Sequence, residues 1–287
     1  MLIKTEKEAP SVAPMSCTVF LSHILVCLEG KLGEETWPQI QGRIPSRFGR
    51  VDYWLNGDLP EQVKALPDPK ERTLEKDIQA CDLLILVGSP EDILRRQKLA
   101  EGSQVMTLLI TVASRDAYIR FKKDWGLSRS VFLGLPPGKE ATVAVGRILD
   151  SLVGLFNYYE YGLVRFNMYD LRHIWPDNVD LCVEYYRSEF NQGSEQDNMT
   201  VKEHYYPWNQ VILDPVKAGE ELNSLLVVAR GLEVPRPERL EKVLSAAQAG
   251  RTGKEGVHWY ALGDCPLALD QVEAVVFMCR RTGSSTG

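Results

Sequence analysis

One stretch, residues 146–175, limits the architecture of this chain more than any other. It reads GRILDSLVGLFNYYEYGLVRFNMYDLRHIW, and its first part carries five apolar residues at helical spacing: Ile148, Leu149, Leu152, Val153 and Phe156. A proline-glycine stop precedes it, and a second apolar run and a polar, aromatic loop follow it. We therefore predict a long central helix over 146–162 that joins an N-terminal unit to a C-terminal one.

Upstream of this helix, apolar runs alternate with charged, amphipathic segments. The strand candidates are 17–28, 50–55, 82–88, 105–112 and 130–133. Fully apolar runs of this length are typical of parallel strands that are covered on both faces. We predict a parallel, Rossmann-like sheet over residues 16–145, preceded by a flexible arm over 1–15, where the chain is polar and contains prolines.

Downstream of the central helix, the pattern becomes mixed. It favours helices over 179–190 and 237–247, a polar surface linker over 191–202, and strands over 224–229, 257–262 and 271–278. This mixture predicts a smaller α+β domain over 163–280 and a flexible tail over 281–287. The predicted fold class is thus α/β, a parallel sheet joined by the central helix to the smaller domain.

Composition excludes several classes of function. The net charge of −6 disfavours non-specific binding to nucleic acid and to acidic membranes. The six cysteines are scattered without a C-x-x-C pair and the four histidines lack ligand spacing, so we expect buried thiols in a cytoplasmic protein and no metal site. The apolar run 18–28 is too short to span a bilayer and has no cleavage site after it, so we interpret it as the first strand and expect no membrane insertion.

Four segments together resemble the FtsZ/tubulin superfamily. GLVRFNMYDL (162–171) resembles the strand start and N-x-D-F-A-D-V loop that follow that family's central helix. DYWLNGDLPEQVKALP (52–67) resembles its strand ending in N-T-D. Two further segments, 224–248 and 258–278, resemble its C-terminal strand and helix and its closing hairpin. The resemblance covers about residues 16–280 and implies a GTP site shared between protomers that are stacked head to tail.

The glycine-rich loops that this family places around the GTP phosphates are not matched. Where the family has G-G-x-G-x-N after the first strand, this chain has SHILV (22–26), and where it has G-G-G-T-G-T-G, this chain has GSPED (88–92). Pro90 removes a backbone donor and the two carboxylates repel a triphosphate. The resemblance therefore implies only a vestigial nucleotide pocket, made of Ser22, His23, Asn56, Asp58, Gly88, Ser89 and Glu91.

The family's acidic loop is degraded too. Arg165 stands where the family has its asparagine, Asn167 stands where it has its first aspartate, and only Asp170 matches. The resemblance implies that this segment contacts a neighbouring subunit through Arg165, Asn167, Tyr169 and Asp170. A salt bridge from Arg165 to Glu91 or Asp92 of that neighbour is one hypothesis for what replaces the nucleotide at the junction.

These observations favour a non-catalytic, FtsZ/tubulin-like pseudo-GTPase with a structural or regulatory role in a cytoskeletal or cell-division system. We expect no catalytic residue and no cofactor, with GTP left open, and a partner that is the chain itself or an FtsZ/tubulin-like protein. The alternative is an α/β small-molecule or nucleotide-binding protein, or an enzyme, with its site at the carboxyl ends of the N-terminal strands. No serine lies in a G-x-S-x-G setting, so hydrolase chemistry has no support.

Overall fold

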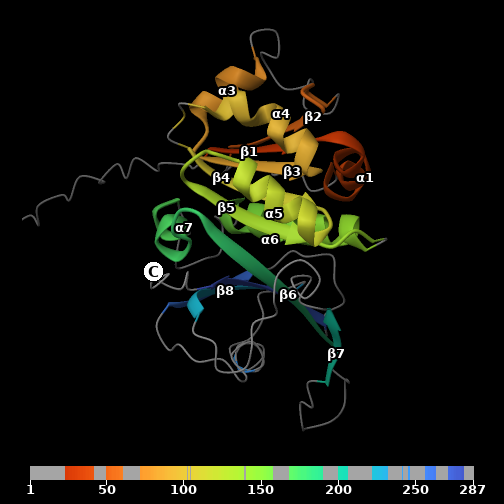
Figure 1. Ribbon diagram of the computed structural model, residues 1–287. Helices are drawn as coiled ribbons and strands as arrows, with labels where there is room; N and C mark the ends of the chain where they lie inside the picture. The colour runs from red at the N-terminus through yellow and green to blue at the C-terminus, as the bar shows by residue number, and fades with distance from the viewer. Residues whose placement is uncertain are drawn as a thin grey trace, which may run out of the picture.

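A computed structural model describes the chain over most of its predicted elements. The described residues are 23–41, 50–60, 72–101, 103, 105–138, 140–157, 168–189, 200–205, 222–231, 241, 245, 256–262 and 271–280. Figure 1 shows the N-terminal half, with its helices around a sheet, and the described strands of the C-terminal half beyond α6.

The N-terminal half is a parallel sheet, which confirms the prediction from the apolar runs. Its strands are β1 (His23–Leu28), β2 (Arg50–Leu55), β3 (Leu83–Gly88), β4 (Met106–Val112) and β5 (Ser130–Leu135). They lie in the order β2-β1-β3-β4-β5, and all neighbouring pairs are parallel. The order changes direction between β1 and β3, and ligands of open α/β sheets bind outside the carboxyl ends of the strands at such a point.

Helices cover both faces of this sheet, as its fully buried strands require. One face packs against α1 (Gly30–Ile40) and α6 (Ala141–Asn157), and the other packs against α3 (Leu74–Ala80), α4 (Pro90–Ala100) and α5 (Arg115–Asp124). Because side chains alternate along a strand, Ile24 and Val26 of β1 join the first core and Leu25 and Cys27 join the second.

The predicted central helix is α6. It begins at Ala141, five positions before the predicted start at Gly146, because the Pro137-Gly138 stop lies directly before it and Ala141 N donates to Gly138 O at 3.2 Å. Its apolar stripe is buried along its length and packs against α1 as well as against strands of the C-terminal half. Residues 158–167 lie outside the described part of the chain, so the predicted end at 162 and the apolar run 163–166 are not placed.

The C-terminal half continues the same sheet. Its elements are α7 (Met168–Ile174), β6 (Val179–Glu189), β7 (Thr200–Tyr205), β8 (Leu222–Gly231), β9 (Val257–Leu262) and β10 (Gln271–Arg280). The described strands follow the order β5-β6-β10-β8-β9, with β7 paired to β6. The predicted strands over 224–229, 257–262 and 271–278 are thereby confirmed.

Among the strands that the structure describes, β6 alone connects the two halves of the sheet. Its first residues pair in parallel with β5 through Val131↔Val179 and Phe132↔Asp180. Its later residues pair antiparallel with β10 and β7. The Asp180 carboxylate also accepts a hydrogen bond from Tyr118 Oη at 2.8 Å and pairs with Lys122, so α5 is attached to the same strand.

Two predictions for the C-terminal half are wrong. The helix predicted over 179–190 is strand β6, in which the side chains of residues 181–186 are buried on both faces. Burial on both faces hides the alternation that identifies a strand. The segment 258–278 is not a hairpin either, because β9 pairs in parallel with β8 and β10 lies between β6 and β8.

Two further predictions fall largely on residues that are not described. The end of the predicted linker 191–202 belongs to β7, which begins at Thr200, and residues 191–199 are outside the described part. Within the predicted helix 237–247, the described positions Glu241 and Ser245 are helical.

Candidate functional site

The loops that follow β1, β2 and β3 meet at the carboxyl edge of the sheet, and Asn56 connects the first two. Its backbone N donates to Leu28 O at 2.9 Å, and its side-chain Oδ1 accepts from Gly30 N at 2.7 Å. Its Nδ2 donates to Glu34 Oε1 at 2.9 Å. Asn56 holds a left-handed φ of 54°, which asparagine adopts more readily than most residues. The turn after β2 is therefore fastened to the start of α1.

Glu29 is the single residue between β1 and α1, and its carboxylate is buried at this edge. Glu29 N donates to Val87 O at 2.8 Å, which joins the end of β1 to the end of β3. Its carboxylate accepts from Arg96 Nε at 2.8 Å and from Arg96 Nη2 at 2.9 Å, while the Glu29 side chain is 6% exposed. Hydrogen bonding to Glu29 raises the pKa of Arg96, and burial acts in the opposite direction.

A second carboxylate, that of Asp92, lies between the starts of α1 and α4. Ser89 caps α4, with Asp92 N donating to Ser89 Oγ at 3.2 Å and Ser89 Oγ donating to Asp92 Oδ2 at 2.7 Å. A Cβ added to Gly30 would overlap this carboxylate. The gap between the loops after β1 and β3 therefore already contains a carboxylate of the chain itself.

The structure brings together most of the predicted pocket. The residues that lie at the carboxyl edge, at the end of β3 or in the loops after β2 and β3, are Asn56, Asp58, Gly88, Ser89 and Glu91. Asp58 closes the turn after β2 through backbone hydrogen bonds with Leu55 at 2.8 and 2.9 Å, and the Asp58 and Glu91 side chains are exposed.

The placement of His23 in that pocket is wrong. The family's loop was matched to residues 22–26, but β1 runs from His23 to Leu28, so His23 lies at the amino edge of the sheet. Ser22 lies outside the described residues. The loop after β1 begins at Glu29, which the sequence analysis missed together with Arg96. A carboxylate directly after a fully apolar strand is the signal that could have identified Glu29.

At the amino edge, His23 belongs to a buried polar network with β2 and α3. His23 Nε2 lies 2.8 Å from Asp52 Oδ2, and Arg72 Nη1 donates to Asp52 Oδ1 at 3.0 Å. Arg72 also pairs with Asp77, which accepts from Trp54 Nε1 at 3.0 Å. Burial alone would lower the pKa of Arg72, but its bonds to Asp77 and Asp52 raise it. These contacts indicate a structural role for His23.

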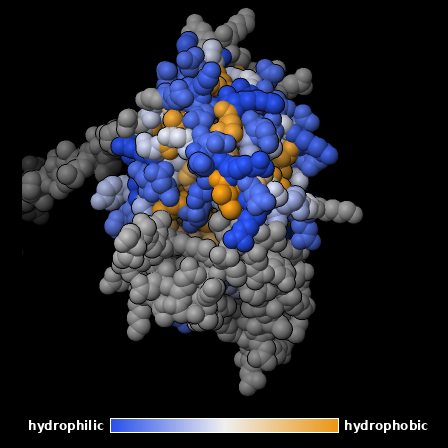
Figure 2. All heavy atoms as spheres, viewed as in Figure 1, coloured by the Kyte–Doolittle hydropathy of each residue, from blue (hydrophilic) through white to orange (hydrophobic). Residues whose placement is uncertain are grey.

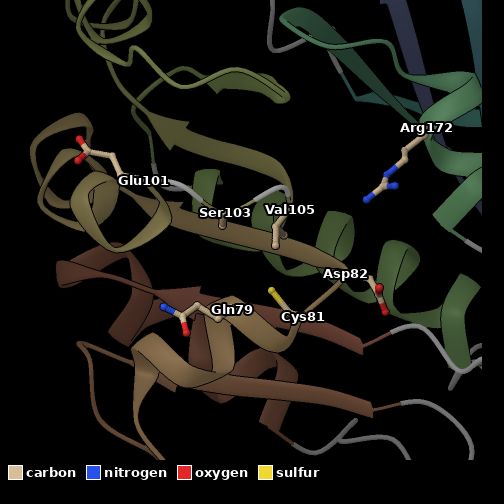
Figure 3. A pocket seen from close by; sticks show the side chains of 7 residues that line it. All are labelled: Gln79, Cys81, Asp82, Glu101, Ser103, Val105 and Arg172. Carbon is tan, nitrogen blue, oxygen red and sulfur yellow. The ribbon is translucent and has the colours of Figure 1, made fainter.

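A recess of about 510 Å³ opens at the same amino edge (Figure 3). It is lined by Gln79, Cys81, Asp82, Glu101, Ser103, Val105 and Arg172. Arg172 comes from α7 and points toward the recess from the side opposite Glu101.

The predicted inter-subunit loop is in part a helix. Tyr169 and Asp170 lie in the first turn of α7, and Tyr169 is 79% exposed. Arg165 and Asn167 lie outside the described residues. The short apolar pattern of Met168, Leu171 and Ile174, all buried, forms this helix, and it was too brief to be recognised in the sequence.

Cys81 should react slowly with iodoacetamide while the protein is folded. Burial raises the pKa of the Cys81 thiol to about 12. Since the thiolate is the nucleophile, only about one Cys81 thiol in 10⁴ is ionised at pH 8. We expect the rate of Cys81 alkylation, mapped by mass spectrometry, to rise about tenfold per pH unit between pH 8 and 10. Fast labelling of folded protein at pH 8 would contradict this and make Cys81 a reactive group of the recess.

Among the described residues, no group of three or more histidine, cysteine, aspartate or glutamate side chains is arranged to hold a metal ion. In the same residues, no helix combines the length and the apolar composition needed to cross a bilayer.

No protein-family model matches the chain, and no curated protein matches it. Solved structures do match over almost its whole length. An empty FtsZ dimer from M. jannaschii is 14% identical, with a TM-score of 0.60 over 90% of this chain and 88% of that one. GDP-form TubZ protofilaments from Bacillus thuringiensis serovar israelensis are 9% identical, with a TM-score of 0.52 over 90% and 88%.

A GDP-bound monomer of CetZ1 from Haloferax volcanii is 10% identical, with a TM-score of 0.52 over 91% of this chain and 95% of that one. At such identities the likeness concerns the fold. The parallel N-terminal sheet, the long α6 and the mixed C-terminal sheet are thus arranged as in these proteins, and the chain has the FtsZ/tubulin superfamily fold.

Proposed function

We propose that this chain is a non-catalytic, FtsZ/tubulin-like subunit that associates head to tail, with itself or with an FtsZ/tubulin-like partner, without bound nucleotide. The observation that carries the proposal is the Asp92 carboxylate between the starts of α1 and α4. Helix N-termini at a switch point attract phosphate groups. Here the same dipoles face a carboxylate of the chain, and a triphosphate would meet like charge at close range.

The two edges of the N-terminal sheet expose side chains of different charge, as a head-to-tail contact between copies requires. The carboxyl edge exposes the carboxylates Glu34, Asp58 and Glu91. The opposite, amino edge exposes Tyr169 and Arg172 on α7 beside the recess. A contact between two different surfaces does not close on itself, so repeated contacts of this kind build filaments.

The contact that we propose is polar. In the view of Figure 2, the described part of the surface is mainly hydrophilic, with separate hydrophobic areas. Arg172 of one copy would pair with the carboxylates at the carboxyl edge of the next, and Arg165 would add a second cation. The solved FtsZ dimer and the TubZ protofilaments support this arrangement only as examples of association by proteins of this fold.

Two charge reversals test the contact. Arg172→Glu alters the amino edge and Glu91→Lys alters the carboxyl edge, and each should weaken self-association about tenfold in sedimentation velocity without nucleotide. A mixture of the two variants should regain association, because the carboxylate introduced at position 172 can pair with the ammonium introduced at position 91 and the unaltered surfaces still pair with each other. The control is Arg120→Glu, an exposed reversal on α5, which should associate as the unaltered protein does.

Two outcomes would overturn the proposal. The first is a protein that stays monomeric at every concentration and with every FtsZ-like partner tested. The second is saturable binding of labelled GTP, with or without magnesium, at concentrations below about 1 mM. Tight GTP binding would favour the alternative of a nucleotide-binding protein or enzyme with its site at the carboxyl edge.

A further inference from the structure

We propose that Arg96 and the loops after β1, β2 and β3 form an oxyanion site whose ligand is the chain's own Glu29 carboxylate. In this interpretation Glu29 both joins β1 to α1 and acts as a bound ligand. Its carboxylate occupies an anion-binding position beside the Arg96 guanidinium, called the seat below, and the chemistry of this position suits a carboxylate or a phosphate.

The Arg96 guanidinium has the geometry of a ligand-binding arginine. Nε and Nη2 each donate to a different oxygen of Glu29, at 2.8 and 2.9 Å. Parallel, bidentate bonds of this type are the means by which arginine recognises carboxylate and phosphate groups. The two residues are 67 positions apart, and their side chains are 6% exposed for Glu29 and 23% exposed for Arg96.

All three loops close around this pair. A Cβ added to Gly57, in the turn after β2, would lie 2.7 Å from Arg96 Nη2. A Cβ added to Gly88, at the end of β3, would lie 3.1 Å from Glu29 Cβ. Gly57 has a φ of 85°, so its missing side chain and its backbone conformation both allow the guanidinium to approach. The pair thus adds a side-chain link among these loops to the backbone hydrogen bonds that already join β1 to β3 and to the turn after β2.

An anion attached to the chain has an advantage over a free one. Its effective concentration is set by the chain, so dissolved anions compete poorly for the seat while Glu29 is present. The loops then stay in their joined arrangement without an external ligand. This inference deepens the proposed function, because it supplies the reason why association would not need a nucleotide.

Removal of the internal ligand should open the seat to small anions. We expect Glu29→Ala to lower the thermal midpoint by about 5–10 °C, because Arg96 loses its counter-charge. Formate, acetate or inorganic phosphate should then raise the midpoint of this variant, by about 3 °C at ten times the dissociation constant. Sodium chloride at equal ionic strength should not raise the midpoint of this variant. In the unaltered protein, formate, acetate and phosphate should change the midpoint no more than sodium chloride does.

Two variants act as matched controls for this rescue. Glu29→Gln fills the same space with a neutral amide, and Glu29→Ala combined with Arg96→Met removes the guanidinium. Neither should respond to formate, acetate or phosphate. An anion response in the double variant would show that the anions act elsewhere and would overturn the proposal, as would a folded Glu29→Ala variant that none of the three anions stabilises.

If Glu29→Ala does not fold even when purified in formate, the proposal is tested by comparing the thermal midpoints of two milder variants. A ligand role requires the charge, so Glu29→Asp should be more stable than Glu29→Gln. The reverse order would mean that Glu29 only fills space, and the proposal would fail. All these midpoints are measured at concentrations too low for association, so a failure of head-to-tail assembly leaves their interpretation unchanged.

Discussion

Replacement of Arg72 by methionine is expected to lower the free energy of unfolding by about 3–5 kcal/mol. Arg72 lies between two buried carboxylates, with bonds of 3.0 Å to Asp52 Oδ1 and of 3.1 Å from its Nε to Asp77 Oδ2. Both aspartates are 4% exposed. Without the guanidinium they lose the cation that they share, and burial of uncompensated charge is costly. Urea denaturation followed by circular dichroism measures the effect.

The control for this prediction is Arg95→Met. The Arg95 side chain is 76% exposed and pairs with Asp92 one turn earlier in α4 at 3.1 Å. Exposed pairs of this kind contribute little, so the loss should stay below about 1 kcal/mol. Equal losses for the two variants would mean that the buried network does not stabilise the protein in the way described here.

A methyl group at Gly33 is expected to destabilise the protein by about 2 kcal/mol, although alanine is the better helix former. A Cβ at Gly33 would lie 2.6 Å from the backbone carbon of Leu28 and 2.9 Å from its oxygen. Neither atom is free to move, because β1 is paired on both sides. Gly33→Ala must therefore push α1 away from the sheet, which chemical denaturation should detect.

A second helical glycine provides the comparison. A Cβ at Gly146 in α6 would meet the end of the flexible, exposed Gln39 side chain, at 2.7 Å from its Oε1. That side chain can turn aside, so Gly146→Ala should be neutral or slightly stabilising. The prediction for Gly33 is wrong if its alanine variant is as stable as that of Gly146.

The N-terminal sheet could be predicted from the sequence because its strands are continuous apolar runs between clear turn and cap residues. Ser89 before Pro90 is an example, since serine and proline in this order are typical of a helix start, and α4 begins at Pro90 with Ser89 as its cap. The strand candidate 17–28 ends at Leu28, as β1 does, but the family's first glycine-rich loop was matched to residues 22–26, inside that strand. This match moved the predicted loop from Glu29 to His23 and so to the wrong edge of the sheet.

The partners of Glu29 were beyond the reach of the sequence for a different reason. Arg96 follows Glu29 by 67 positions, and only the strand order β1-β3 brings the first turns of α4 close to the loop after β1. The same holds for the C-terminal half, where β6 was interpreted as a helix. A strand buried on both faces shows no alternation, and its identity follows from the β5 and β10 strands that pair with it.

The connection of the two halves through β6 has a consequence for the nascent chain. When Leu135 has left the ribosome, β5 is the last strand of the parallel sheet, and its open side presents unpaired backbone groups. The strand that covers it begins at Val179, 44 positions later, and pairs through only two residues, Val131 and Phe132. Synthesis should therefore pass through a stage in which this side is exposed to other chains, and molecules released early would be prone to aggregate along it.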